Sequence, residues 1–347
     1  MNSLRHVVPR PIRRAASAFL AQRKSERLQR ELAAMATRGI PIVAGPWLGE
    51  VGFELLYWVP FLRWCAERLT IDPERFVVVS RGGTENWYRP FASRYADVFD
   101  QVTAEMFREQ HDARVRDLGE QKQTRITEFD REIVAAAMRH AQVREWSLLH
   151  PSLMYDVLNP YWWGHQADRW VHNHVRYARL DTPPKTDVLD LPPRYVAAKF
   201  YFNECFPATP QNRAFVRDAL RTFAAVGPVV ALSTGLNIDD HRGDRVDEHG
   251  VRHLPEGLDP ARNLHIQSAI VAGADAFVGT YGGFSYMAPF HGVKSLAFYS
   301  DPGGFSQKHL HMARSAFDQI GASGLLEVRD AAGGADIAGD VSTWGHR

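Results

Sequence analysis

The sequence predicts an α/β fold with two domains, and three observations carry this prediction. Short apolar runs alternate with helix-length segments in both halves of the 347-residue chain, which is the pattern of repeated strand–helix units. Glycine-rich loops follow several of these runs, as they do where the strands of a parallel sheet end. A proline-rich stretch at 181–194 separates the halves, as expected of an interdomain linker.

The first domain is expected to span 39–180. Its elements should be a strand at 41–44, a glycine-rich loop at 45–52, a helix at 53–69 and a strand at 75–80. Pro60 should kink or interrupt the helix, because proline lacks the amide hydrogen and its ring clashes with the preceding turn. Arg81 follows the second strand and is either an acceptor or phosphate ligand or part of a surface turn. The two strand–loop units indicate a parallel sheet with its loops at the carboxyl edge.

The middle of the chain is helical by composition at 103–146 and aromatic at 150–180. The aromatic side chains there are open to two interpretations, a surface that stacks on a sugar acceptor or simple packing. We favour packing, because large aromatic side chains mostly fill cores. The pair His172 and His174 has no third ligand at a diagnostic spacing, so no metal site is predicted there.

The second domain is expected to span 195–330, with a loose Gly- and Ala-rich tail at 331–347. Its elements should be a strand at 195–201, a helix at 211–225, a strand at 228–232, a helix at 261–273, a strand at 276–279, a helix ending near 291 and a strand at 295–299. Lys308, His309 and His311 lie where the last helices return toward the sheet edge.

Gly282 and Gly283 stand between a strand and a helix, and this turn is the most informative stretch of the chain. A backbone without Cβ atoms can take unusual angles and lets a ligand approach closely. The helix that follows presents unpaired amides and the positive end of its dipole. The arrangement therefore predicts a phosphate-binding turn.

Composition indicates a soluble protein with a large core, since 45% of the residues are hydrophobic and 23% are charged. No apolar run is long enough to cross a bilayer. Cys65 and Cys205 are too few for a disulfide framework and offer no paired-cysteine metal spacing, which indicates a reducing compartment.

The charge is concentrated at the start of the chain. Residues 1–38 hold nine Lys or Arg against two Glu, whereas the rest of the chain is net acidic. This basic leader is either a helix over 12–35 that lies on an anionic membrane surface, with Phe19, Leu28, Leu32 and Met35 as a thin apolar stripe, or a solvated and partly disordered segment. The second interpretation is favoured. An acidic body also argues against nucleic-acid binding.

The second half resembles the nucleotide-sugar-binding region of the heptosyltransferase-like glycosyltransferases. The resemblance lies in Asn263 to Gly279, followed by Gly283-Phe284-Ser285 and Gly292-Val293. It implies the GT-B layout, in which two Rossmann-like domains face each other across a cleft. It also implies a donor diphosphate bound by Gly282, Gly283, Phe284 and Ser285, with Lys199 as cationic partner. The family pattern has an acid where Tyr281 stands and a histidine where Tyr286 stands, so the particular sugar is not carried over.

Two acids of the first glycine loop are candidates for the catalytic base. The resemblance implies an acid on this loop, and Glu50 in Gly49-Glu50-Val51-Gly52 fits, although a structural or capping role is equally compatible with its position. Glu54 lies in the first helical turn, where it can instead complement the helix dipole. Ser233, Thr234 and Gly235 follow a strand and are candidates for the nucleotide pocket, or for an ordinary turn.

The predicted function is a metal-independent glycosyltransferase without a cofactor. It would use a nucleotide-sugar donor and a cell-surface polysaccharide or glycolipid precursor as acceptor, in the cytoplasm. Peripheral contact with the inner membrane through 1–38 follows only under the first interpretation of the leader. The alternatives are a nucleotide-sugar epimerase of the same layout, which needs acid and base groups on both faces of the sugar ring, and a silent nucleotide-binding scaffold. The epimerase acts on the donor alone, whereas the transferase requires an acceptor.

Overall fold

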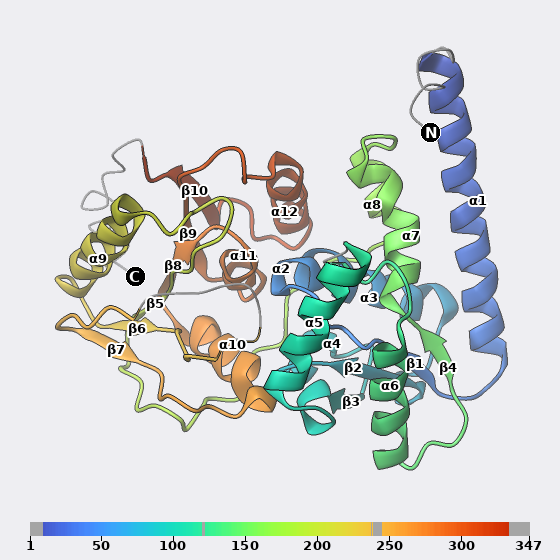
Figure 1. Ribbon diagram of the computed structural model, residues 1–347, viewed down its shortest axis with the longest axis horizontal. Helices are drawn as coiled ribbons and strands as arrows, with labels where there is room; N and C mark the ends of the chain where they lie inside the picture. The colour runs from blue at the N-terminus through green and yellow to red at the C-terminus, as the bar shows by residue number, and fades with distance from the viewer. Residues whose placement is uncertain (1–9, 120–121, 237, 239–244, 333–347) are drawn as a thin grey trace.

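The computed structural model describes residues 10–119, 122–236, 238 and 245–332, and these form two α/β lobes side by side (Figure 1). The first lobe contains a four-stranded parallel sheet in the order β3-β2-β1-β4. Its strands are β1 (Ile42–Ala44), β2 (Phe76–Ser80), β3 (Arg94–Asp97) and β4 (Ser147–Leu149).

The second lobe contains a six-stranded sheet in the order β10-β9-β8-β5-β6-β7, again parallel throughout. Its strands are β5 (Val196–Lys199), β6 (Val229–Ala231), β7 (Val251–His253), β8 (Ala276–Thr280), β9 (Lys294–Tyr299) and β10 (Leu326–Asp330). Two parallel sheets with helical crossovers confirm the predicted pair of Rossmann-like domains. The tail beyond 332 lies outside the described residues.

The helices of the first lobe follow the predicted order. They are α2 (Val51–Phe53), η2 (Glu54–Trp58), α3 (Val59–Leu69), η3 (Pro73–Arg75), α4 (Glu85–Tyr88), η4 (Val98–Asp100), α5 (Ala104–Leu118), α6 (Glu128–His140), α7 (Pro151–Trp162) and α8 (Asp168–His172). The predicted interruption at Pro60 is confirmed, because the five residues of η2 form a π-helical turn directly before α3, where Pro60 occupies the first turn.

The helices of the second lobe are α9 (Pro210–Ala224), η5 (Pro260–Arg262), α10 (Asn263–Gly273), α11 (Gly283–Phe290) and α12 (Gln307–Gln319). Four strands escaped the sequence analysis, namely β3, β4, β7 and β10, and each lies at an outer edge of its sheet. Edge strands are half exposed and carry charged residues such as Arg94, Arg252 and Glu327, so they lack the continuous apolar run that identifies a central strand.

The expectation of a partly disordered leader is wrong for the described part of 1–38. These residues form the 28-residue helix α1 (Arg10–Thr37), which runs along α7 and α3 (Figure 1). Leu28 and Leu32 are almost fully buried there, and the buried Ser25 hydroxyl bonds His174 Nε2 at 2.7 Å. Two residues of the proposed membrane-facing stripe are therefore part of the protein core.

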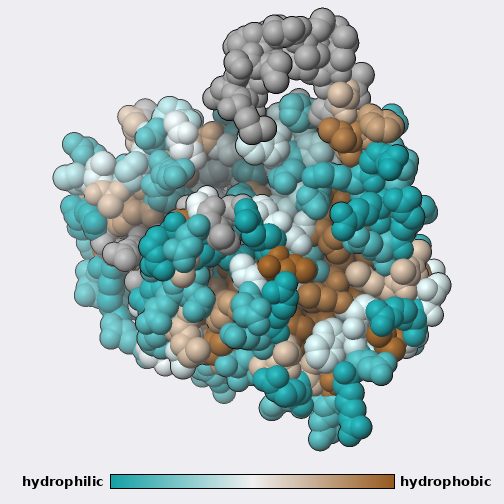
Figure 2. Space-filling model, turned by 45° about the vertical axis from the view of Figure 1, so that its right-hand side comes forward, coloured by the Kyte–Doolittle hydropathy of each residue, from teal (hydrophilic) through white to brown (hydrophobic). Residues whose placement is uncertain are grey.

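The outer half of α1 is different. Phe19 and Leu20 are 61% and 62% exposed, and apolar surface is visible at the top of the molecule (Figure 2). Among the helices built from the described residues, none has the length and apolar character that crossing a membrane requires.

Packing explains most of the aromatic side chains between 150 and 180, as favoured above. Tyr155 and Tyr161 are buried, and Trp162 and Trp170 pack partly buried against the main core. Trp163 differs, since it is 75% exposed at the end of α7. The aromatic segment is thus mainly structural, with one free aromatic side chain at its tip.

The docking of α1 yields a stability prediction. Replacing Leu32 by Ala should lower the free energy of unfolding by about 2–4 kcal/mol, because the side chain is buried and its removal leaves a cavity. Phe19→Ala is the matched control and should change the stability by less than about 0.5 kcal/mol, since Phe19 is exposed. Urea unfolding of the full chain measures both; equal effects of the two variants would contradict the docked helix.

Candidate functional site

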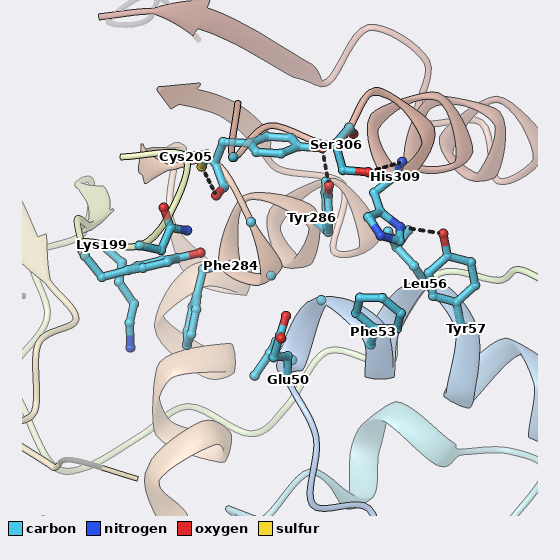
Figure 3. A pocket seen from close by; sticks show the side chains of 18 residues that line it. Glu50, Phe53, Leu56, Tyr57, Lys199, Cys205, Phe284, Tyr286, Ser306 and His309 are labelled. Carbon is cyan, nitrogen blue, oxygen red and sulfur yellow. Dashed lines mark hydrogen bonds between the residues drawn. The ribbon is translucent and has the colours of Figure 1, made fainter. Parts of the chain in front are cut away.

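A pocket of about 150 Å³ lies between the two lobes, at the carboxyl ends of strands from both sheets (Figure 3). The first lobe contributes Glu50, Val51, Gly52, Phe53, Leu56 and Tyr57. The second lobe contributes Lys199, Tyr201, Asn203 and Cys205 after β5, Tyr281 to Phe284 and Tyr286 around the glycine turn, and Gly304, Ser306 and His309 before and within α12. Ligands of open parallel sheets bind at this edge.

The two glycine loops meet at the floor of this pocket. A Cβ atom on Gly283 would lie 2.6 Å from the backbone nitrogen of Gly52, and one on Gly282, whose φ is +152°, would overlap the Tyr201 hydroxyl. Gly283 is therefore required by packing between the lobes and Gly282 by packing within the second lobe, in addition to the ligand approach inferred from the sequence. A substitution at Gly283 would therefore disturb the contact between the lobes as well as any contact with a ligand.

Two helices point their amino termini at the pocket from opposite lobes. One begins at Val51 and runs through η2 into α3; the other is α11, which begins at Gly283. The first-turn amides of a helix have no acceptor within the helix, and each terminus carries about half a positive charge. Two such termini in contact repel each other unless negative charge lies between them.

Lys199 ends β5 and lines the pocket as expected. Its Nζ lies 3.9 Å from the centroid of the Phe284 ring and donates a hydrogen bond to Gln267 Oε1 at 2.5 Å. Gln267 is fully buried and in turn donates to Asn263. This chain of contacts fixes the ammonium beside the start of α11.

Only some of the other predicted donor residues line the pocket. Phe284 lines the pocket, whereas Ser285 is buried and serves the turn, because its hydroxyl accepts from Gly282 N at 3.1 Å and donates to Gly282 O at 2.7 Å. Ser233, Thr234 and Gly235 follow β6, at the same edge of the sheet but outside the pocket lining. The structure thus brings together the glycine turn and Lys199 but not the 233–235 turn.

Glu50 is exposed and lines the pocket, directly before the first turn of α2. It occupies the N-cap position, yet its side chain makes no capping hydrogen bond. Its carboxylate is therefore not committed to the helix backbone, and it lies near Phe284 of the other lobe (Figure 3).

Glu54 is placed away from the pocket and is fully buried. Its Oε1 accepts hydrogen bonds from the Ser80 hydroxyl, at 2.6 Å, and from the Tyr88 hydroxyl, while Oε2 has no hydrogen-bond partner among the described residues. Burial raises the pKa of this carboxyl to about 7, opposed by the nearby Arg81. Glu54 thus lies behind the glycine loop, where it does not touch a ligand in the pocket.

Arg81 is buried as well, so it is neither a pocket ligand nor part of a surface turn. Its guanidinium donates to the carbonyl oxygen of Gly49, with its terminal nitrogen at 2.7 Å. Arg81 therefore positions the loop that carries Glu50.

The lining side chains at the opposite end of the pocket are aromatic and include a neutral histidine. The Tyr57 hydroxyl bonds His309 Nδ1 at 2.8 Å, and burial lowers the pKa of His309 to about 4, with smaller contributions from Lys122 and Lys308. Tyr286 donates to the Tyr281 hydroxyl at 2.6 Å. Glu50 is the one carboxylate that lines the pocket in the described part of the chain.

Sequence reasoning found Glu50, Lys199, the glycine turn and His309 but missed Tyr57, Tyr201 and Asn203. Tyr201 and Asn203 alternate with Lys199 just beyond β5, so the period of two along an extended chain was an available signal. Tyr57 lies one helical turn after Phe53, but nothing in a single sequence indicates that this face meets α12.

The described residues contain no group of three or more His, Cys, Asp or Glu side chains arranged to hold a metal ion. His172 and His174 point to different partners, Ser315 and Ser25, and do not form a pair. Metal independence and the absence of a cofactor remain predictions.

Comparison with known proteins gave no matching family model and no matching curated protein. Among solved structures, the chain is similar to a glycosyl transferase family 9 protein from Veillonella parvula, at 10% identity over 88% of this chain and 89% of that one, with a TM-score of 0.43. It is also similar to the glycosyltransferase SnogD from Streptomyces nogalater, at 13% identity, 88% and 94% coverage and a TM-score of 0.38.

A third similar structure is a UDP-N-acetylglucosamine 2-epimerase from Listeria monocytogenes, at 10% identity, 75% and 79% coverage and a TM-score of 0.32. All three scores lie below 0.5. The assignment of the fold therefore rests on the strand orders above, and any activity has to be argued from the pocket.

Glu54 makes the stability of the protein depend on pH. The folded protein holds this proton up to about pH 7, whereas an unfolded chain releases it near its ordinary value of 4.5. The stabilising contribution is therefore complete below about pH 4.5 and is lost as the pH rises toward 7. Relative to Glu54→Gln, the wild type should lose about 2–3 kcal/mol of unfolding free energy between pH 5 and pH 8.

Urea unfolding of both proteins at each pH measures this difference and cancels the other titrating groups. A difference that stays constant with pH would contradict a buried, proton-binding Glu54.

Proposed function

We propose that this protein is a glycosyltransferase that binds a nucleotide-sugar donor in the pocket between its lobes. The observation that carries the proposal is the meeting of two helix amino termini, Lys199 and Glu50 in one interdomain pocket. A departing nucleoside diphosphate needs positive charge, and an acceptor hydroxyl needs a base. The pocket has both, on opposite walls.

The amino terminus of α11 and the ammonium of Lys199 are suited to the donor diphosphate. The ammonium is held beside Phe284 by Gln267, so little reorganisation is needed when charge develops on the leaving group. The nucleotide would extend along the edge of the sheet toward Ser233, Thr234 and Gly235, which follow β6, the neighbour of β5.

Glu50 is the proposed base. It belongs to the lobe opposite Lys199, it is exposed to the pocket, and it makes no capping hydrogen bond. Its proton would come from the acceptor hydroxyl as that oxygen bonds to the anomeric carbon and the bond to the diphosphate breaks. The buried Glu54 cannot serve this step, because it does not line the pocket.

The acceptor we propose is a polysaccharide or glycolipid precursor at a membrane surface. Two exposed apolar side chains, Phe19 and Leu20, lie on the outer half of α1 within a segment that holds nine Lys or Arg against two Glu. Such a helix suits an anionic membrane face. The buried half of α1 would then hold the body of the enzyme at that surface.

Two assays test the donor site and distinguish the alternatives. Nucleoside diphosphates and nucleotide sugars are screened for thermal stabilisation of the wild type and of Lys199→Gln; one nucleotide should stabilise the wild type and lose most of its effect in the variant. Conversion of the donor without acceptor would indicate an epimerase. Stabilisation without turnover, in the presence of lipid and polysaccharide extracts, would indicate a silent scaffold.

The base is tested by Glu50→Gln. Transfer of labelled sugar to the acceptor fraction should fall by about 10²–10⁴-fold, because the amide cannot accept the proton, while the donor still binds. Glu50→Asp, which keeps the carboxylate on a shorter stem, should retain part of the rate. Wild-type turnover in Glu50→Gln would exclude Glu50 as the base.

The membrane contact is tested by flotation with vesicles. Binding to vesicles that contain phosphatidylglycerol should fall by about tenfold or more when Phe19 and Leu20 are both replaced by Ser, since two exposed apolar side chains no longer insert. Val226→Ser, at an exposed apolar position of the second lobe, is the control. Equal binding of both variants would contradict the proposed contact.

A further inference from the structure

The two lobes repeat one local arrangement around the pocket. Each of the two facing helices has a Gly-Phe pair in its first turn, Gly52-Phe53 directly after Val51 in the first lobe and Gly283-Phe284 at the start of α11 in the second. A lysine ammonium lies over each of the two phenylalanine rings. Lys199 Nζ lies 3.9 Å from the centroid of Phe284, and Lys122 Nζ lies 3.0 Å from the centroid of Phe53.

Lys122 reaches this position from the segment between α5 and α6. The groups that it faces are the Phe53 ring, the Glu50 carboxylate and the neutral His309 of α12, all of which line the pocket. Within the described part of the chain, its Nζ has no hydrogen-bond or salt-bridge partner. The Lys122 side chain is half-buried, so its ammonium loses part of its hydration without a protein acceptor among the described residues to replace it.

The surroundings act on this ammonium in two ways. Burial lowers the pKa of Lys122 to about 8, and the attraction of Glu50 opposes that shift. Lys122 is thus charged at neutral pH and neutral at pH 9, and a bound anion would favour the charged form.

The charges around the pocket favour a doubly negative ligand. Among the described residues, Lys199 and Glu50 line the pocket as a cation and an anion, and His309 is neutral because its pKa is about 4. Lys122 does not line the pocket itself, but its ammonium lies on the lining residue Phe53 and adds a second cation at the border. Two helix amino termini add roughly one further positive charge. The sum is about +2, which matches the two charges of a diphosphate that links a nucleoside to a sugar.

We propose that Lys122 is a second diphosphate-binding residue, which acts with Lys199 from the opposite lobe so that the anion links the two domains. The inference rests on the proposed donor site and adds a residue of the first lobe to it. The ligand chemistry is a pyrophosphate group, either free or within a nucleotide sugar. Glu50 is the competing charge, so its removal should strengthen the binding that the loss of Lys122 weakens.

The test uses inorganic pyrophosphate and the full-length protein, with dissociation constants from calorimetry at pH 7. Lys122→Gln should raise the dissociation constant about tenfold or more, as should Lys199→Gln. Glu50→Gln should lower it several-fold. Lys185→Gln, at an exposed position of the linker, is the matched control and should leave it unchanged. Circular dichroism and the melting temperature show whether each variant is folded.

A second readout separates charge from structure. Lys122→Arg keeps the charge at every pH used, so the wild type should lose affinity relative to this variant between pH 7 and pH 9, by about fivefold or more. The ratio of the two constants cancels the titration of pyrophosphate itself. A constant ratio, or wild-type affinity in Lys122→Gln, would overturn the role of Lys122.

The results distinguish failure of the proposed glycosyltransferase function from failure of the inference about Lys122. Pyrophosphate binding that depends on Lys122, without transfer from any nucleotide sugar, would support the two-lysine site and refute the glycosyltransferase. Transfer that is insensitive to Lys122→Gln would support the enzyme and overturn the inference about Lys122.

Discussion

The contact between Gly52 and Gly283 is the constraint on which the rest of the site depends. A Cβ atom on Gly283 would lie 2.6 Å from the backbone nitrogen of Gly52, which is too close, and one on Gly52 would lie 3.2 Å from the Cα atom of Gly283, which is tight. This approach brings two helix amino termini and two sheet edges to one pocket. The geometry of the lobes and the electrostatics of the pocket therefore have one cause.

The electrostatic consequence is an excess of positive potential in a space with few anionic groups. Glu50 is the one carboxylate among the described lining residues, and Tyr281 and Tyr286 form an uncharged wall. The lysines lie on aromatic faces, where a cation is stabilised without being neutralised.

Sequence analysis identified the strands and helices whose apolar residues follow a regular pattern along the chain. Central strands such as β2 and β8 are buried on both faces and read as continuous apolar runs. Lys199 stands at the end of another central strand, and its role was predicted from the resemblance. Edge strands lacked that signal. Tyr57 and Lys122 could not be recognised from sequence, because their positions depend on contacts between segments far apart in the chain. The burial of Leu28 and Leu32 was missed for the same reason, since an amphipathic stripe predicts a covered helix face but not whether protein or membrane covers it.

Helix α7, on which α1 packs, is synthesised long after α1 itself. The Lys24–Asp156 pair that joins α1 to α7 spans 132 residues, so at 5–20 residues per second the ribosome needs roughly 7–26 s to produce the surface on which α1 docks. During this interval the side chains of Leu28 and Leu32 have no place in a core. The nascent chain therefore carries a basic amphipathic segment whose apolar side chains stay uncovered until α7 has been made.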